Sequence, residues 1–182
     1  SGTPIQKAAQ YAHEQFAAWN LNPSFHAWSS GTRSGRNVVG DLVGTSSPSE
    51  IVLVCGHLDD MPSTGSAPGA DDNASGSSGV LVAAQTLLQR PWERTLRFAL
   101  FTGEEQGLLG SRAYAAMAKA RGDNIVAVLN LDMIAWNTAG SLPTPRPPAR
   151  SYASHGRRSD RSSGRPRRAA APRRAGASPS AR

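Results

Sequence analysis

The chain contains almost no cysteine and no long apolar segment, and each shortage excludes a class of protein. Its single cysteine, Cys55, excludes an internal disulfide. Because Cys55 ends an apolar run, we expect it to be a small buried side chain rather than a nucleophile. No apolar run is long enough to span a membrane, and no signal-peptide pattern is present. The sequence begins at Ser1 rather than at methionine, as it would if an upstream segment had been removed or never included.

Acidic residues are nearly absent from residues 141–182, here called the tail. The tail contains eleven arginines and one acid, whereas residues 1–140 contain nine Lys+Arg and twelve Asp+Glu. The net charge of +7 therefore comes from the tail. Its only large apolar side chains are Leu142 and Tyr152, too few to offset the entropy of ordering. We expect one domain over residues 1–140 and a disordered tail rich in Arg, Pro, Ser and Ala over residues 141–182.

Helical and strand patterns alternate along residues 1–140. Residues 20–36, rich in Asn, Ser, Gly and Trp, predict an irregular loop or an edge strand. The order of strand, loop and helix predicts an α/β fold, a mostly parallel open sheet with helices on both faces. The predicted helices cover residues 4–19, about 75–89 and 108–120, and the predicted strands cover 37–44, 51–55, 95–101 and 125–131.

Acidic and imidazole side chains follow the last three predicted strands. His57 follows the first of them, Glu104 and Glu105 follow the second, and Asp132 follows the third. The carboxyl ends of parallel strands meet at one edge of the sheet, where ligands bind in open α/β folds. Asp72 lies in the loop above that edge. Because clustered carboxylates repel one another unless a cation or a proton intervenes, the pattern predicts a metal site.

The kinds of ligand indicate the chemistry of this site. Carboxylate and imidazole ligands without thiolates favour zinc, manganese or cobalt in a catalytic site. A carboxylate can bridge two metals, and two-metal hydrolases use the pair of ions to activate a water. In the tandem Glu104-Glu105, one side chain can bind a metal while its neighbour acts as general base. Asp59, two residues after His57, is placed to hold the second imidazole N–H.

Four motifs in these loops occur together in one known family. The order and spacing resemble the di-zinc aminopeptidases typified by bacterial leucyl aminopeptidase, over roughly residues 37–137. Because four separate motifs agree, the resemblance is specific. The motifs are His57-Leu58-Asp59, Pro68-Gly69-Ala70-Asp71-Asp72-Asn73-Ala74-Ser75-Gly76, Glu104-Glu105-Gln106-Gly107-Leu108-Leu109-Gly110-Ser111 and Asn130-Leu131-Asp132-Met133.

The resemblance implies a role for each of these side chains. His57 and Asp132 would bind the first zinc, Asp72 would bridge the two zinc ions, and Glu105 would bind the second. Glu104 would be the general base, and Asp59 would orient His57. The resemblance also implies a cis peptide between Asp72 and Asn73 and a hydrogen-bonding role for Asp71 within its loop. Peptides with a free N-terminus would be the substrates, and a secreted or periplasmic location is favoured.

One ligand of the family is missing from this pattern. The family places a second histidine on the second zinc, yet the only histidine after Asp132 is His155, inside the tail. We expect His155 not to serve, so that the second zinc binds weakly and the chain is poorly active or inactive. The abrupt change near residue 140 is typical of a GC-rich gene read out of frame. Relatives that encode this tail without a frame change would refute that hypothesis.

Two other functions fit parts of the sequence. One is a single-zinc relative, such as a glutaminyl-cyclase-like transferase, although Glu104-Glu105 and Asp71-Asp72-Asn73 favour the peptidase. The other is nucleic-acid binding through the tail, whose arginines would bind phosphates without sequence preference. Tyr152 is the only aromatic residue of the tail, which limits base stacking. We expect neither a specific nucleic acid nor a membrane as partner. The preferred N-terminal residue and the oligomeric state cannot be read from the sequence.

Overall fold

The computed structural model describes residues 3–61, 65 and 68–135 of the chain. Thr3 is the N-cap of the first helix, and its backbone N–H donates to the side chain of Gln6. None of the helices in this part of the chain is long and apolar enough to cross a membrane. The elements run in the order α1 (Pro4–Ala18), β1 (Ser24–Ser30), β2 (Arg33–Leu42), β3 (Ser47–His57), the short helical turn η1 (Ala70–Ser75), α2 (Gly76–Leu87), β4 (Arg94–Phe101), α3 (Leu109–Arg121) and β5 (Asn124–Asn130).

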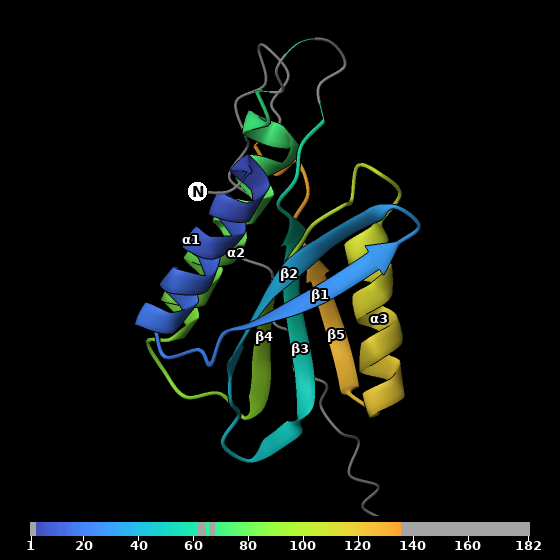
Figure 1. Cartoon of the computed structure of the whole chain (residues 1–182). Helices are drawn as coiled ribbons and strands as arrows, with labels where there is room; N and C mark the ends of the chain where they lie inside the picture. The colour runs from blue at the N-terminus through green and yellow to red at the C-terminus, as the bar shows by residue number, and fades with distance from the viewer. Residues whose placement is uncertain (1–2, 62–64, 66–67, 136–182) are drawn as a thin grey trace, which may run out of the picture. The chain divides into compact units, whose positions relative to one another are not determined.

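The five strands form one open sheet in the order β1-β2-β4-β3-β5 (Figure 1). Strands β4 and β5 both pair with β3 in parallel. Each lies after a helical crossover, as parallel neighbours require. The carboxyl ends of these three strands therefore reach the same edge of the sheet, here called the rim.

The sheet is mixed, so the prediction of a mostly parallel sheet is wrong for its other half. Strand β1 pairs antiparallel with β2, and β2 pairs antiparallel with β4. The physical reason is the short turn at Gly31-Thr32, because a two-residue connection can join only antiparallel strands. Gly31 adopts the positive φ of 59° that such a turn favours. Residues 24–30, predicted as loop or edge strand, form the edge strand β1.

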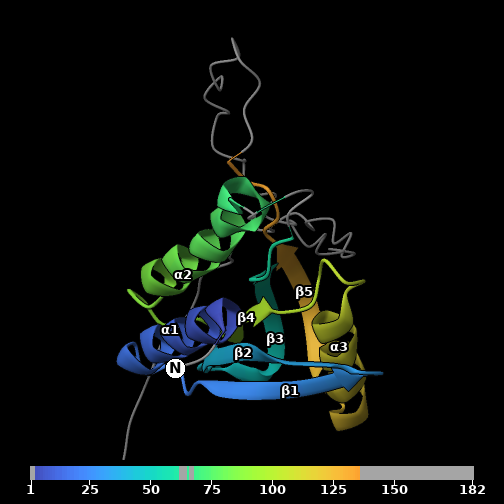
Figure 2. The same cartoon turned by 45° about the horizontal axis from the view of Figure 1, so that its top comes forward.

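Helices cover both faces of the sheet, as the sequence predicts. In Figure 2, α1 and α2 lie together on one face and α3 lies on the other. The core under α1 and α2 includes Phe16, Val80 and Phe98, and the core under α3 includes Cys55, Phe101 and Tyr114. Alternate residues of β4 enter opposite cores, so this central strand is buried along nearly its whole length.

Candidate metal centre

His57 ends β3 and lies almost fully buried at the rim. Its Nδ1 is 2.9 Å from the backbone oxygen of Asp59. A carbonyl oxygen only accepts hydrogen bonds, so this contact places the imidazole proton on Nδ1. The lone pair of Nε2 is then free to face a cation, which is the tautomer that a metal-binding histidine needs.

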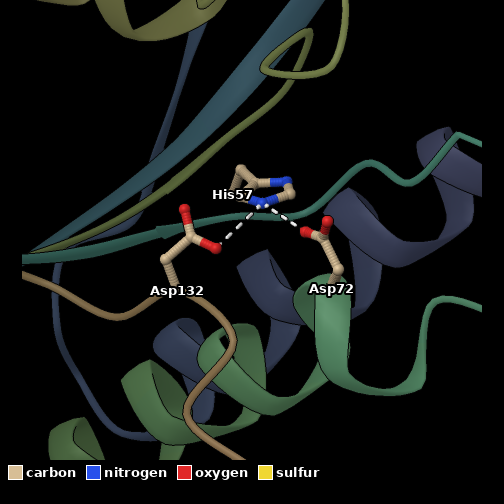
Figure 3. Close-up of side chains that lie close together, drawn as sticks. All are labelled: His57, Asp72 and Asp132. Atoms are coloured by element: carbon tan, nitrogen blue, oxygen red, sulfur yellow. Dashed lines mark ion pairs between the residues drawn. The ribbon is translucent and has the colours of Figure 1, made fainter. Parts of the chain in front are cut away.

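Two carboxylates from different segments face this nitrogen (Figure 3). Nε2 of His57 lies 3.1 Å from Oδ1 of Asp72, which belongs to η1, and 3.7 Å from Oδ1 of Asp132, which follows β5. Ligand atoms about 2.0–2.1 Å from a tetrahedral zinc ion stand roughly 3.3 Å apart. The three side chains therefore fit a zinc ion in both donor type and spacing.

The peptide bond between Asp72 and Asn73 is cis, as the resemblance implies. The side chain of Asn73 is buried beside it and holds three segments together. Its Nδ2 donates to the backbone oxygens of His57 and Leu131, and its Oδ1 accepts from the N–H groups of Gly76 and Met133. These four bonds fix the two acidic segments against the end of β3.

The loop after β4 brings Glu104 and Glu105 to the same imidazole. Ligand atoms of His57, Glu104 and Glu105 all lie within 4.8 Å of one another, as do those of His57, Asp72 and Asp132. Both glutamates are partly buried. The two groups share His57, so all five predicted metal ligands and bases converge on one small region.

Asp59 holds this loop with its carboxylate. Its Oδ1 and Oδ2 each lie 3.2 Å from the backbone nitrogens of Glu104 and Glu105, respectively, and accept their hydrogen bonds. The same carboxylate is 4.0 Å from Nδ1 of His57, farther than a hydrogen bond reaches. It is the backbone oxygen of Asp59 that contacts the imidazole, and the carboxylate positions the tandem glutamates.

The rim carries a large excess of negative charge. Asp59, Asp72, Glu104, Glu105 and Asp132 make no ion pair with lysine or arginine in the described residues. Partial burial, followed by the neighbouring carboxylates of Asp72 and Glu104, raises the pKa of Glu105. Both causes disfavour the charged form of this carboxylate.

The sequence matches a known peptidase family. The model of peptidase family M28 matches residues 37–173, well over half of the chain. The chain belongs to peptidase family M28. Leucine aminopeptidase 1 of Trichophyton rubrum is 43% identical over an alignment covering 48% of this chain and 26% of that protein. The M28 chain thus spans about a quarter of the length of the curated relatives it matches.

Solved structures show the same relationship. A zinc aminopeptidase from Bacillus subtilis is 34% identical, with a TM-score of 0.50, covering 56% of this M28 chain and 25% of the other. The glutaminyl cyclase of Macrostomum lignano gives a TM-score of 0.62 at 19% identity, over 73% of this chain and 47% of that one. An identity this low shows a shared fold alone. The family makes this chain a relative of zinc aminopeptidases by descent.

Two polar residues support the candidate site through hydrogen bonds to the backbone around His57, and the sequence does not predict this role. The sequence predicts a cis peptide at Asn73 but not the four hydrogen bonds of its side chain, and it gives no role to Ser77, whose Oγ donates to the backbone oxygen of His57 at 2.6 Å. Oδ1 of Asp71 accepts from the hydroxyl of Ser75 in the same turn and from the N–H of Ala135, in the segment after β5. The spacing of polar residues inside the Asp71–Ser77 stretch was the available signal. His155 lies outside the described residues.

Cys55 is buried, as predicted from its place at the end of an apolar run. Burial raises the pKa of its thiol to about 11. A thiol with so high a pKa stays protonated at neutral pH and is a poor nucleophile. The cysteine therefore belongs to the core under α3 rather than to the site.

Proposed function

We propose that this chain carries the active-site rim of a zinc-dependent aminopeptidase that removes N-terminal residues from peptides by means of a two-metal-activated water. The observation that carries the proposal is the convergence of His57, Asp72 and Asp132, with donor atoms 3.1 and 3.7 Å apart. Family membership and the 43% identity to a leucine aminopeptidase support the choice of reaction.

Each rim residue takes one role in this proposal. His57 and Asp132 would hold the first zinc ion, Asp72 would bridge, and Glu105 would hold the second ion. When bound, zinc would act as a Lewis acid that polarises the scissile carbonyl and lowers the pKa of the attacking water. The group of His57, Asp72 and Asp132 supports the first of these ligand sets, and the glutamates lie beside the same imidazole.

Glu104 is proposed as the general base. The carboxylate of Asp59 accepts hydrogen bonds from the backbone N–H groups of both Glu104 and Glu105. The base and a metal ligand are therefore held together on one loop. The partly buried carboxylate of Glu104 would accept a proton from the attacking water and deliver it to the leaving amine. A base fixed by its backbone in this way is held in the orientation that catalysis needs.

The second zinc ion should bind more weakly than the first. The first group supplies three protein ligands, whereas Asp72 and Glu105 alone remain for the second, and the sequence after Asp132 offers only His155. We therefore expect the chain to be impaired as a peptidase. The tandem glutamates favour the peptidase over a single-zinc transferase, and the tail proposed for nucleic-acid binding lies outside the described residues.

The test combines zinc titration with leucine p-nitroanilide hydrolysis. Titration calorimetry should show one tight zinc ion and a second, weaker one. Asp132→Asn should weaken the tight ion at least tenfold, because it removes a charged ligand. The matched control is Asp60→Asn, the same change at an exposed acid outside both ligand groups, which should leave zinc binding unaltered. Equal effects of the two variants would contradict the assignment, and two tight ions with ordinary turnover would contradict the impairment.

A further inference from the structure

The loop from Thr102 to Gly110 presents both glutamates and is closed at its base by its own backbone. The N–H of Gly110 donates to the oxygen of Thr102 at 3.1 Å, and the N–H of Leu109 donates to the oxygen of Gly103 at 2.8 Å. Two further bonds end on the oxygen of Glu104. These contacts leave the N–H of Thr102 without a backbone partner in the loop, whereas Gly110 already belongs to the first turn of α3.

Asn37, in the middle of β2, bonds the backbone at both ends of the loop. Its side chain is completely buried. Its Oδ1 accepts from the N–H of Thr102 at 3.0 Å, and its Nδ2 donates to the oxygen of Gly110 at 2.9 Å. The second Nδ2 hydrogen faces Nδ1 of His26 at 3.0 Å. One neutral amide thus bridges the two ends of the loop and uses both of its donors.

Trp28 of β1 supports the same base from below. Its Nε1 donates to Oγ1 of Thr102 at 2.9 Å, and that hydroxyl donates to the backbone oxygen of Arg36 at 3.1 Å. A Cβ at Gly103 would lie 2.6 Å from the indole, so the loop passes directly over the ring. The hairpin of β1 and β2 carries no rim residue. Its side chains nevertheless contact the base of the Thr102–Gly110 loop, here called the glutamate loop.

We propose that Asn37 is a positioning residue for Glu104 and Glu105, acting through the loop and not by contact with substrate or metal. The inference rests on the proposed function for the roles of the two glutamates. Asp59 bonds the loop beside the candidate site, at its two glutamates, while Asn37 bonds the loop where it begins and ends. Without Asn37, the buried N–H of Thr102 would lose its partner and the tie from β2 to Gly110 would be gone, a loss that proteins relieve by shifting the backbone.

The test compares two variants of Asn37 with a matched control. Asn37→Leu removes both hydrogen bonds to the loop at a similar side-chain volume. Asn37→Asp keeps an acceptor for the N–H of Thr102 but loses the two donors. The control is Thr95→Val, an isosteric change at the other end of β4. Thr95 is equally buried and bridges the backbones of Gly44 and Pro48. All three variants remove buried hydrogen bonds, but only those at Asn37 touch the loop.

The first readout is the visible absorption of bound Co²⁺. The spectral component that depends on Glu105 is identified as the one lost in Glu105→Gln. Asn37→Leu should lower the affinity for the Co²⁺ ion that gives this component at least tenfold. A tenfold loss is the lower end of the range seen when a group that supports a metal ligand is removed. The component from His57, Asp72 and Asp132 should change less than about twofold. Thr95→Val should change neither component.

The second readout is amide hydrogen exchange, which needs no metal. Asn37→Leu should speed exchange at residues 104–110 at least tenfold relative to Thr95→Val. Asn37→Asp should keep slow exchange at the N–H of Thr102 and lose it at the far end of the loop. Exchange or cobalt binding that is the same in Asn37→Leu and Thr95→Val would overturn the role of Asn37. Absence of cobalt binding to the unaltered chain would overturn the proposed function instead, and exchange alone would then decide the role of Asn37.

Discussion

Two clusters of charged side chains lie in this sheet, and they differ in whether their charges balance. The cluster on the α3 face is centred on Arg97 of β4. Its guanidinium bonds both carboxylate oxygens of Asp41 at 2.7 Å, and it also reaches Asp123 at 2.6 Å and the hydroxyl of Tyr114 at 3.1 Å. Arg121 forms a second ion pair with Asp123. Two cations face two anions, so this cluster is neutral without any added ion.

The rim cluster contains only one basic group among five carboxylates, the imidazole of His57. The opposite pKa directions of two acids express the contrast. Hydrogen bonding to Arg121, and then to Arg97, lowers the pKa of Asp123, whereas burial and neighbouring carboxylates raise the pKa of Glu105. A balanced cluster needs no added ion, while the repulsion in an unbalanced one is relieved by a cation or a proton. The comparison separates structural charge from functional charge within one sheet.

Removing the central cation of the balanced cluster should have the largest effect. Arg97→Met leaves Asp41 and Asp123 without their main partner, and breaking a buried ion pair from one side costs about 3–5 kcal/mol. Urea unfolding measures the change. The control is Arg94→Met on the same strand, where the pair with Glu50 is exposed and its loss should cost less than about 1 kcal/mol. A loss at Arg97 no greater than at Arg94 would show that the cluster does not stabilise the fold.

Adding zinc should stabilise the chain through the rim alone. At a free zinc concentration of 100 times Kd, the gain in unfolding free energy is about 2.7 kcal/mol. The measurement is urea unfolding with zinc and with a chelator. Asp132→Asn should lose most of this gain, and Arg97→Met should retain it in full. A gain that disappears in Arg97→Met but persists in Asp132→Asn would show that zinc binds at the Arg97 cluster and not at the rim.

Neutralising one acid in each cluster should give effects of opposite sign in the metal-free chain. Asp123→Asn removes the acceptor of two arginines and should destabilise by about 1.5–3 kcal/mol, as for hydrogen bonds to charged groups. Glu105→Gln removes a carboxylate that its neighbours repel. It should stabilise, by less than about 1 kcal/mol because water screens this partly exposed group. Unfolding free energies measured at pH 7 with a chelator provide the check, and equal signs would remove the distinction between the clusters.

The parallel half of the fold could be predicted from local patterns because each strand there is separated from the next by a helix. The pairing of the hairpin half could not, since β1 contains few of the apolar alternations that identify a strand and is predicted only as a loop or an edge strand. Its residues pair with β2 through the backbone, and Trp28 is the only member of β1 that is fully buried. The sequence patterns therefore predict the rim strands and part of β2, but not the antiparallel pairing of β1 and β2 beside them.

The candidate site divides in the same way. His57, Glu105 and Asp132 are candidates in the sequence because they follow strands, and Asp72 is a candidate because of its motif. The carboxylate of Asp59 was expected to hold His57, yet it bonds the loop 45 residues later in the chain. Asn37 has partners 65 and 73 residues away, so no spacing in the sequence could connect them. Side chains that position others through long-range backbone contacts are recognisable only in three dimensions.

The smallest expected effect is a loss of folding stability on acidification, through His26. Burial, and then the charge of Arg121, lowers the pKa of His26, whose imidazole also packs edge-on against Tyr114. The unfolded chain therefore binds the proton more readily, so stability is full above pH 6.5 and falls as the pH drops through 6.5 toward the folded pKa. Protonation would also remove the Nδ1 lone pair that accepts from Asn37. His26→Gln keeps an acceptor without a titrating group, so it should lose less stability than the unaltered chain between about pH 7.5 and about pH 5.5 in chelator. Parallel losses in the two proteins would show that His26 does not contribute to the pH dependence.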